Sequence, residues 1–141
     1  AVDTSGFGSS VARETVLKEA DLVLLDIKSI MPEVFRKVAG VSSEPTFSAL
    51  EEMAEWGTPV WIRHVIVPGL TDSLNDAEKL AEKLSGYKNI EKVELLPFHK
   101  MGEYKWEHLD TEYLLSDTKP PSESLMEEIT DIFKGFGFTV S

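Results

Sequence analysis

Three nearly continuous apolar runs of strand length constrain the fold of this chain more than any other feature. They cover residues 21–28, 59–67 and 90–99 and are rich in Val, Ile and Leu. Such runs are typical of parallel strands that are buried on both faces. The intervening segments 46–56 and 73–84 carry apolar residues at helical spacing, and a glycine lies just beyond each. The sequence therefore predicts an α/β fold in which parallel strands alternate with helices.

Further elements are expected near both ends of the chain. Helices are expected over 11–20, after the N-cap candidate Ser10, and in a last segment that opens at Pro121 and Ser122. Residues 138–140 are expected to add a short strand. Right-handed β–α–β units build a doubly wound sheet or part of a β/α barrel. Because a closed barrel needs roughly 250 residues, the 141 residues are expected to form one domain with at most half of a barrel.

Composition excludes several classes of function. The 14 basic and 25 acidic residues give a net charge of −11, which repels nucleic acid and anionic membranes. The chain has no cysteine, so it cannot itself hold a thiolate-bound iron–sulfur cluster. No apolar run approaches the ~20 residues of a membrane span, and no signal peptide pattern occurs at the start. A cytoplasmic protein is expected, and the polar turn directly after Ala1 and Val2 suggests a first strand that begins before residue 1.

Polar side chains interrupt or follow the predicted strands where ligands of parallel α/β folds bind. Asp26 and Lys28 share one face of their strand by alternation. Arg63 lies mid-strand among apolar neighbours, on the same face as Trp61, and alternation places Glu94 on the helix side of its own strand. Asp3 and His99 lie at the ends of two other strands. If these faces line one pocket, carboxylates and cations converge there, which suits a zwitterionic ligand.

Simpler interpretations remain open for these residues. Asp26 and Lys28 are equally consistent with an ion pair at the rim of the sheet. For Arg63 a function or a buried partner is favoured, because an unpaired charge in such a strand costs several kcal/mol. His64 alternates to the opposite face and is expected to pack under a helix. The aromatic-rich connection 98–120 is long enough to suggest a function.

Six segments, in this order and spacing, resemble the C-terminal half of the glycyl-radical-enzyme activases of the radical S-adenosylmethionine superfamily. The likeness is strongest to the branch that acts on pyruvate formate-lyase. The segments that carry it are DTSGF at 3–7, DLVLLDIK at 21–28, VWIRHVIVPGLTD at 60–72, VELLPFHKMGEYKW at 93–106, Tyr113 with Leu114, and KPPS at 119–122.

The resemblance implies the C-terminal part of an incomplete (β/α) barrel. In this family a 4Fe-4S cluster, held by a CxxxCxxC loop near the N-terminus, reductively cleaves S-adenosylmethionine. The resulting 5′-deoxyadenosyl radical takes a hydrogen atom from a glycine of the partner, here a glycyl-radical enzyme such as pyruvate formate-lyase. A flavodoxin-type protein is the implied electron donor. The N-terminal cluster-binding part is absent from residues 1–141, so this segment is expected to be inactive alone.

The resemblance also assigns residues to ligands. Asp26, Lys28, Arg63 and His99 match positions that contact S-adenosylmethionine. Asp3, Thr4, Asp26 and the backbone carbonyl of Leu24 match a monovalent-cation site beside the carboxylate of that ligand. No catalytic residue is assigned within this chain.

Two alternatives belong to other functional classes. A non-catalytic binding module would use the aromatic segment around Tyr104 and Trp106 to hold a protein partner. A non-radical barrel enzyme would use Lys28 as a Schiff-base amine beside a carboxylate.

Overall fold

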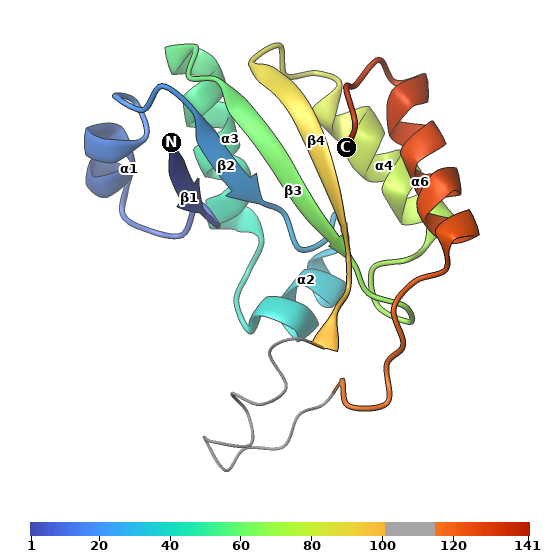
Figure 1. The fold of residues 1–141 in the computed structure, drawn as a ribbon. Coiled ribbons are helices and arrows are strands. Elements are labelled where there is room, and N and C mark those ends of the chain that lie inside the picture. Colours follow the sequence, from blue (N-terminus) through green and yellow to red (C-terminus); the bar gives the residue numbers. More distant parts are fainter. Residues whose placement is uncertain (101–114) are drawn as a thin grey trace.

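The computed structural model describes residues 1–100 and 115–141, which form a four-stranded sheet with helices (Figure 1). The strand order is β1-β2-β3-β4, and every neighbouring pair is parallel. This confirms the α/β fold of parallel strands alternating with helices. The elements are β1 (Val2–Thr4), α1 (Ser10–Val16), β2 (Val23–Asp26), α2 (Pro32–Ala39), α3 (Glu44–Trp56), β3 (Val60–Ile66), α4 (Leu74–Leu84), β4 (Ile90–Pro97) and α6 (Glu123–Gly135).

Local chemistry sets the helix ends. The hydroxyls of Ser73 and Ser122 accept hydrogen bonds from the first-turn amides of α4 and α6, and Gly57 ends α3 with φ of 73°. The expected first helix was placed too late, because Ser9 and not Ser10 caps α1, which already ends at Val16. Helix α2 was not expected at all.

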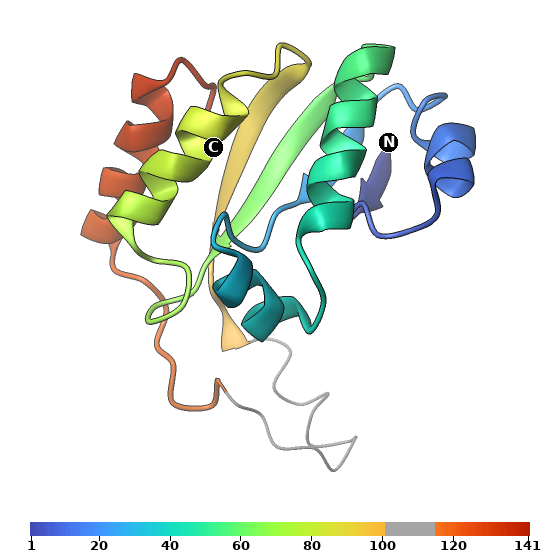
Figure 2. The same ribbon diagram turned by 180° about the vertical axis from the view of Figure 1, so that it is seen from behind.

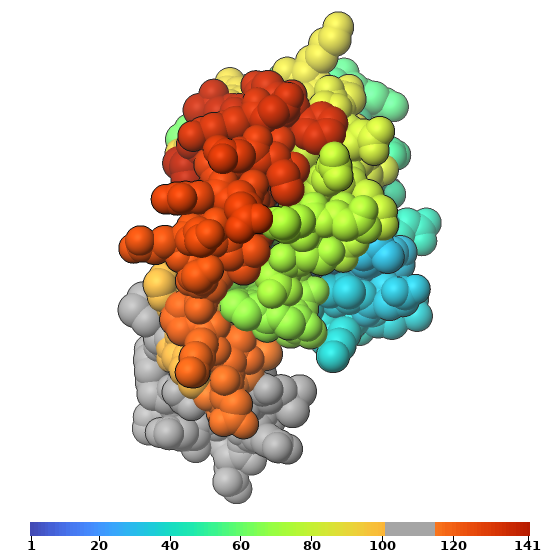
Figure 3. Space-filling view, turned by 90° about the vertical axis from the view of Figure 1, so that its right-hand side faces the viewer, coloured from blue at the N-terminus to red at the C-terminus, as the bar shows by residue number. Residues whose placement is uncertain are grey.

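The core lies between one face of the sheet and helices α3, α4 and α6 (Figure 2). Alternate residues of the central strands face these helices, and α4 packs beside α6 at the β4 side of the sheet (Figure 3). The buried apolar strand residues are Val23, Leu25, Val60, Ile62, Ile66, Val93 and Leu95, and Ile27 directly after β2 is buried with them. Burial of these apolar side chains is the main favourable contribution to folding.

The other face of the sheet carries partly exposed residues, and no described helix lies across it (Figure 1). Leu24, Asp26, Trp61, Arg63 and Glu94 lie on this open face by strand alternation and register. At one edge of the sheet, β1 pairs only with β2 among the described residues. At the other edge, Val140 forms a single parallel bridge with Val93, so the expected strand at 138–140 is reduced to a bridge.

Two expectations concern segments rather than the sheet. The aromatic segment around Tyr104 and Trp106, on which the binding-module alternative rests, lies outside the described residues. Within the described parts of the chain, every helix is too short or too polar to cross a lipid bilayer.

Candidate functional site

The parallel register brings the predicted charged residues to neighbouring positions on the open face. Asp26 of β2 is the register partner of Arg63 of β3, and Asp3 of β1 is that of Leu24. Partners in neighbouring strands point to the same face of a sheet. Lys28 follows β2 and lies two residues beyond Asp26, on the same face. Three adjacent strands therefore present charged groups to one region.

Arg63 links the carboxylates of this cluster. Its Nε donates to Asp26 Oδ1 at 2.9 Å, and its Nη2 donates to Asp3 Oδ1 at 2.9 Å. Lys28 Nζ donates to the second oxygen of Asp26 at 3.1 Å. The side chains of Arg63 and Asp26 are each 24% exposed, so water screens their ion pair only in part. We call Asp3, Asp26, Lys28 and Arg63 the charged cluster.

The charges of the cluster reinforce one another. Burial opposes ionisation of Asp26, but hydrogen bonds and charges from Arg63 and Lys28 outweigh it and hold the pKa of Asp26 below its usual value. The hydrogen bond to Asp26 raises the pKa of Arg63, with further support from the charge of Asp3. Asp26 is therefore ionised at neutral pH, and the cluster holds both signs of charge.

A buried histidine on the helix side of the sheet supports the end of β2, where Asp26 and Lys28 lie. His64 is 4% exposed, and its Nδ1 lies 2.8 Å from the carbonyl oxygen of Ile27, directly after β2. The amide of Ile27 donates to the carbonyl of Arg63 at 3.0 Å. Ile27 lies between Asp26 and Lys28, and both its amide and its carbonyl are thus hydrogen-bonded to residues of β3. His64 is therefore buried on the opposite face from Arg63, as alternation predicted.

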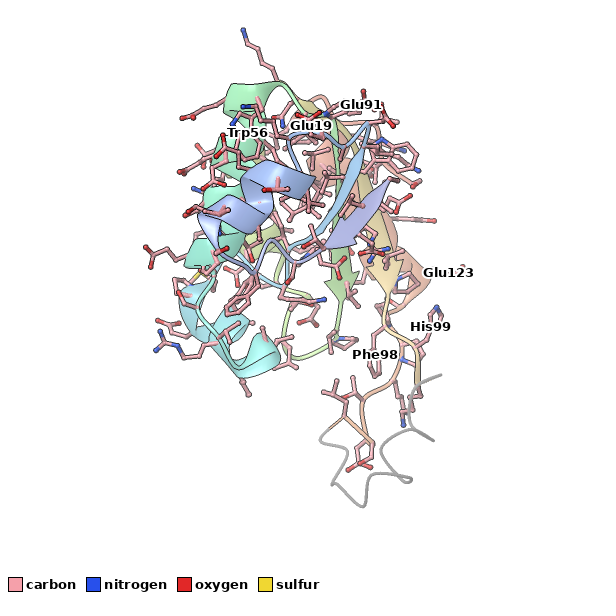
Figure 4. The ribbon with its side chains drawn as sticks, turned by 90° about the vertical axis from the view of Figure 1, so that its left-hand side faces the viewer. Glu19, Trp56, Glu91, Phe98, His99 and Glu123 are labelled. Atoms are coloured by element: carbon pink, nitrogen blue, oxygen red, sulfur yellow. The ribbon has the colours of Figure 1, made fainter. Side chains whose placement is uncertain are left out.

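The other predicted residues lie apart from the hydrogen bonds of the cluster. Thr4 Oγ1 accepts from the amide of Gly6 at 3.0 Å, and Thr4 pairs in register with the buried Leu25. His99 is exposed just beyond β4 (Figure 4). It lines a hollow of about 430 Å³ with Pro97, Pro120, Pro121, Glu123, Met126 and Glu127. Within residues 1–100 and 115–141, no hydrogen bond joins His99 to the cluster.

Three further residues share the open face, of which only Trp61 was expected on the face of Arg63. Trp61, Lys92 and Glu94 lie beside the cluster, and Lys92 Nζ donates to Glu94 Oε1 at 2.9 Å. Glu94 was expected on the helix side of its strand, but it lies on the open face as the register partner of Arg63. Alternation counted from the buried residues Val93 and Leu95 would have placed it correctly.

The cluster suits a ligand that carries charges of both signs. Carboxylates can bind an ammonium or sulfonium group, and Arg63 or Lys28 can bind a carboxylate. Both oxygens of Asp26 are engaged by cationic side chains, so Asp26 becomes available to a cation only when those side chains turn to an anion. Among the described residues, no group of three or more His, Cys, Asp or Glu could hold a metal ion.

Comparison with curated proteins finds similar sequences among pyruvate formate-lyase-activating enzymes. The chain is 37% identical to pyruvate formate-lyase 1-activating enzyme of Escherichia coli K12 over 144 residues. It is 39% identical to the pyruvate formate-lyase-activating enzyme of Clostridium pasteurianum over 134 residues. These matches cover 99% and 95% of this chain but only 57% and 56% of the relatives. The chain therefore spans little more than half their length. No family model matches it.

Solved structures share the fold at lower sequence identity. A domain of pyruvate-formate lyase-activating enzyme from Bacteroides vulgatus aligns with a TM-score of 0.81 and 22% identity, covering 99% of this chain and 78% of that one. Streptococcus suis SuiB bound to S-adenosylmethionine aligns with a TM-score of 0.68 and 15% identity, covering 99% and 30%. At these identities the likeness establishes the fold alone.

Proposed function

Because this chain is homologous to part of the pyruvate formate-lyase activating enzymes, we propose that its charged cluster forms one wall of an S-adenosylmethionine site. The whole protein would use that site to generate a glycyl radical on a partner such as pyruvate formate-lyase. The chain would contribute ligand binding, with Asp26, Lys28, Arg63 and His99 as the contacting residues. A flavodoxin-type electron donor is part of the same proposal.

One observation carries the proposal: Arg63 joins acids from two neighbouring strands on a face that no described helix covers. S-adenosylmethionine carries a sulfonium, an ammonium and a carboxylate, so it needs both anionic and cationic partners. The cluster supplies two of each.

The residues fit the two implied inorganic groups differently. An iron–sulfur cluster would supply the electron that cleaves S-adenosylmethionine, but none of the 141 residues is a cysteine. Its ligands would therefore come from outside this chain, and the chain alone would not cleave the ligand. A monovalent cation could be held by Asp3, Asp26 and the carbonyl of Leu24 once Arg63 and Lys28 turn to the carboxylate of the ligand. Thr4 fits this site less well, because its side chain alternates to the face of Leu25 and its hydroxyl accepts from Gly6.

Ligand titration of the 141-residue chain tests the wall directly. S-adenosylmethionine is added in ¹⁵N NMR, and we expect shifts at Asp26, Lys28 and Arg63. Arg63→Ala should raise the Kd about tenfold or more, because a hydrogen bond to a charged group contributes roughly 1.5–3 kcal/mol.

Arg13→Ala is the matched control for this titration. Arg13 pairs with Glu52 at 2.7 Å between two helices, so its loss removes the same charge and a similar ion pair away from the cluster. Binding that survives Arg63→Ala as well as it survives Arg13→Ala would show that the site assignment is wrong.

A second experiment tests the chemistry of the whole protein. The chain is fused to the part of the E. coli relative that it does not match, and iron and sulfide are reconstituted. Formation of 5′-deoxyadenosine by the fusion, and none by the 141-residue chain, is the expected result. If a loaded fusion binds S-adenosylmethionine but never cleaves it, the proposed reaction is wrong while the binding wall stands.

A further inference from the structure

A second ion pair lies next to the charged cluster on the open face. Lys92 Nζ donates to Glu94 Oε1 at 2.9 Å, and both residues belong to β4. The two side chains are only 23% and 22% exposed. Glu94 is the register partner of Arg63, so its carboxylate lies beside the residue that links the cluster.

Arg63 therefore has an acidic neighbour on each side. Asp26 of β2 and Glu94 of β4 are both its register partners, and neighbouring strands lie only about 4.7–4.9 Å apart. A guanidinium on the flexible stem of Arg63 can reach either. In the structure it donates to Asp26 and Asp3, whereas Glu94 pairs with Lys92. Arg63 can therefore point either toward Asp26 or toward Glu94.

Lys92 is held in place from its other side. Its Nζ lies 4.4 Å from the ring centroid of Trp61, the register partner of Lys92. The indole Nε1 of Trp61 donates to Glu91 Oε2 at 3.2 Å, which fixes the ring. A cation over an indole face is attracted to it. The ammonium of Lys92 is thus held between the ring of Trp61 and the carboxylate of Glu94, the register partner of Arg63.

We infer that Lys92 is a positioning residue for Arg63, because by pairing with Glu94 it leaves the guanidinium to face Asp26 and Asp3. Without the ammonium, the partly buried Glu94 carboxylate has no partner and draws Arg63 toward β4. Arg63 would then turn away from β1 and β2. The effect on ligand affinity rests on the proposed function, whereas the orientation of Arg63 is measured without any ligand.

Four versions of the 141-residue chain test this inference: wild type, Lys92→Met, Glu94→Gln and the double variant. Methionine keeps the aliphatic stem against Trp61 and removes the charge. The readout is the ¹⁵N NMR signal of the Arg63 Nε–H, which donates to Asp26 in the structure. In Lys92→Met we expect this signal to shift and its exchange with water to quicken severalfold. Lys92→Met/Glu94→Gln should restore the wild-type signal, because the competing carboxylate is gone.

Matched controls separate positioning from general effects of charge. Lys79→Met removes the same charge from an ion pair with Asp76 on α4, which covers the opposite face of the sheet, and should leave the Arg63 signal unchanged. Lys92→Arg keeps the charge and should also leave it unchanged. If Lys92→Met does not fold, Lys92→Gln is measured in its place with the same expectations.

The inference is overturned if the Arg63 signal is unaffected by loss of Lys92, or if Glu94→Gln does not restore it in the double variant. The ligand arm is separate. The Kd for S-adenosylmethionine should rise at least about threefold in Lys92→Met and recover in the double variant, since apparent affinity falls with the fraction of molecules in the competent orientation. An Arg63 signal that behaves as expected, together with unchanged affinity, would uphold the positioning role and contradict the proposed function.

Discussion

His64, which is buried behind the charged cluster, makes the stability of the folded chain depend on pH. Burial lowers the pKa of its ring, the charge of Lys28 lowers it further, and the hydrogen bond to Ile27 offsets these effects only in part. The unfolded chain therefore binds a proton near the ordinary value of 6.5, where the folded chain does not. Protonation favours the unfolded state, so stability is lost as pH falls below that value.

We predict that the free energy of unfolding decreases between neutral pH and pH ~5 by up to about 1.4 kcal/mol per pH unit. His64→Asn should flatten this dependence, because the amide can still donate to the carbonyl of Ile27 but does not titrate. Urea denaturation at a series of pH values measures the slope. His99→Asn, at an exposed histidine, is the matched control. An unchanged slope in His64→Asn would mean that other groups cause the acid sensitivity.

At the scale of the elements, the turn after β1 packs closely against α3 and supports the strand that carries Asp3. Gly6 has a φ of 76°, and a Cβ there would lie 2.9 Å from Ala49 Cβ and 3.1 Å from Thr46 Cα. The hydroxyl of Thr46 donates to the carbonyl of Ser5 at 2.6 Å, which ties the turn to α3. The position of Asp3 therefore depends on how closely this turn approaches the helix.

Gly6→Ala is predicted to lower the free energy of unfolding by about 2–4 kcal/mol, from the positive φ and the overpacking against α3 together. Gly135→Ala is the matched control. Gly135 has no positive φ, and no heavy atom beyond its chain neighbours and its own helix backbone lies within 4 Å of a Cβ there. That substitution should leave stability unchanged or raise it slightly. Urea denaturation compares the two variants. Equal effects would contradict the close approach of the turn to α3.

The elements also show how far sequence reasoning reached. The long strands and helices α3, α4 and α6 were predictable, because their burial follows simple periods of two or 3.6 residues. Helix α2 was missed although Val34, Phe35 and Val38 are at helical spacing; it is short, and only Phe35 of its eight residues is buried. Its signals were Pro32 at the start and Gly40 after its end.

The charged cluster, too, was predictable only in part. Alternation predicted that Asp26 and Lys28 share a face and that Arg63 shares one with Trp61, because alternation depends only on each strand. The bond from Arg63 to Asp3 depends on the strand order and on the register between strands that are far apart in the sequence. No local pattern encodes either. Lys92 was missed for the same reason, since its importance comes from lying beside Arg63, whereas the face of Glu94 could have been read from alternation within its own strand.

At the scale of the whole molecule, the open face and the outer edge of β1 leave apolar and backbone groups without a covering layer among the described residues. Phe7 and Val11, which follow β1, are 66% and 71% exposed. Unpaired strand edges and exposed apolar patches favour association with another chain. The net charge of −11 acts against it, because like-charged molecules repel.

These two effects predict that the chain self-associates and that salt strengthens the association. The screening length falls from about 10 Å at 0.1 M salt to about 3 Å at 1 M, so repulsion weakens while apolar attraction does not. Light scattering across a salt series at high protein concentration measures the mass. Phe7→Ser should reduce association, whereas Phe136→Ser, at an exposed aromatic after α6, should not. A monomer at every salt concentration, including those at which the charge repulsion is screened, would contradict the prediction that this surface associates.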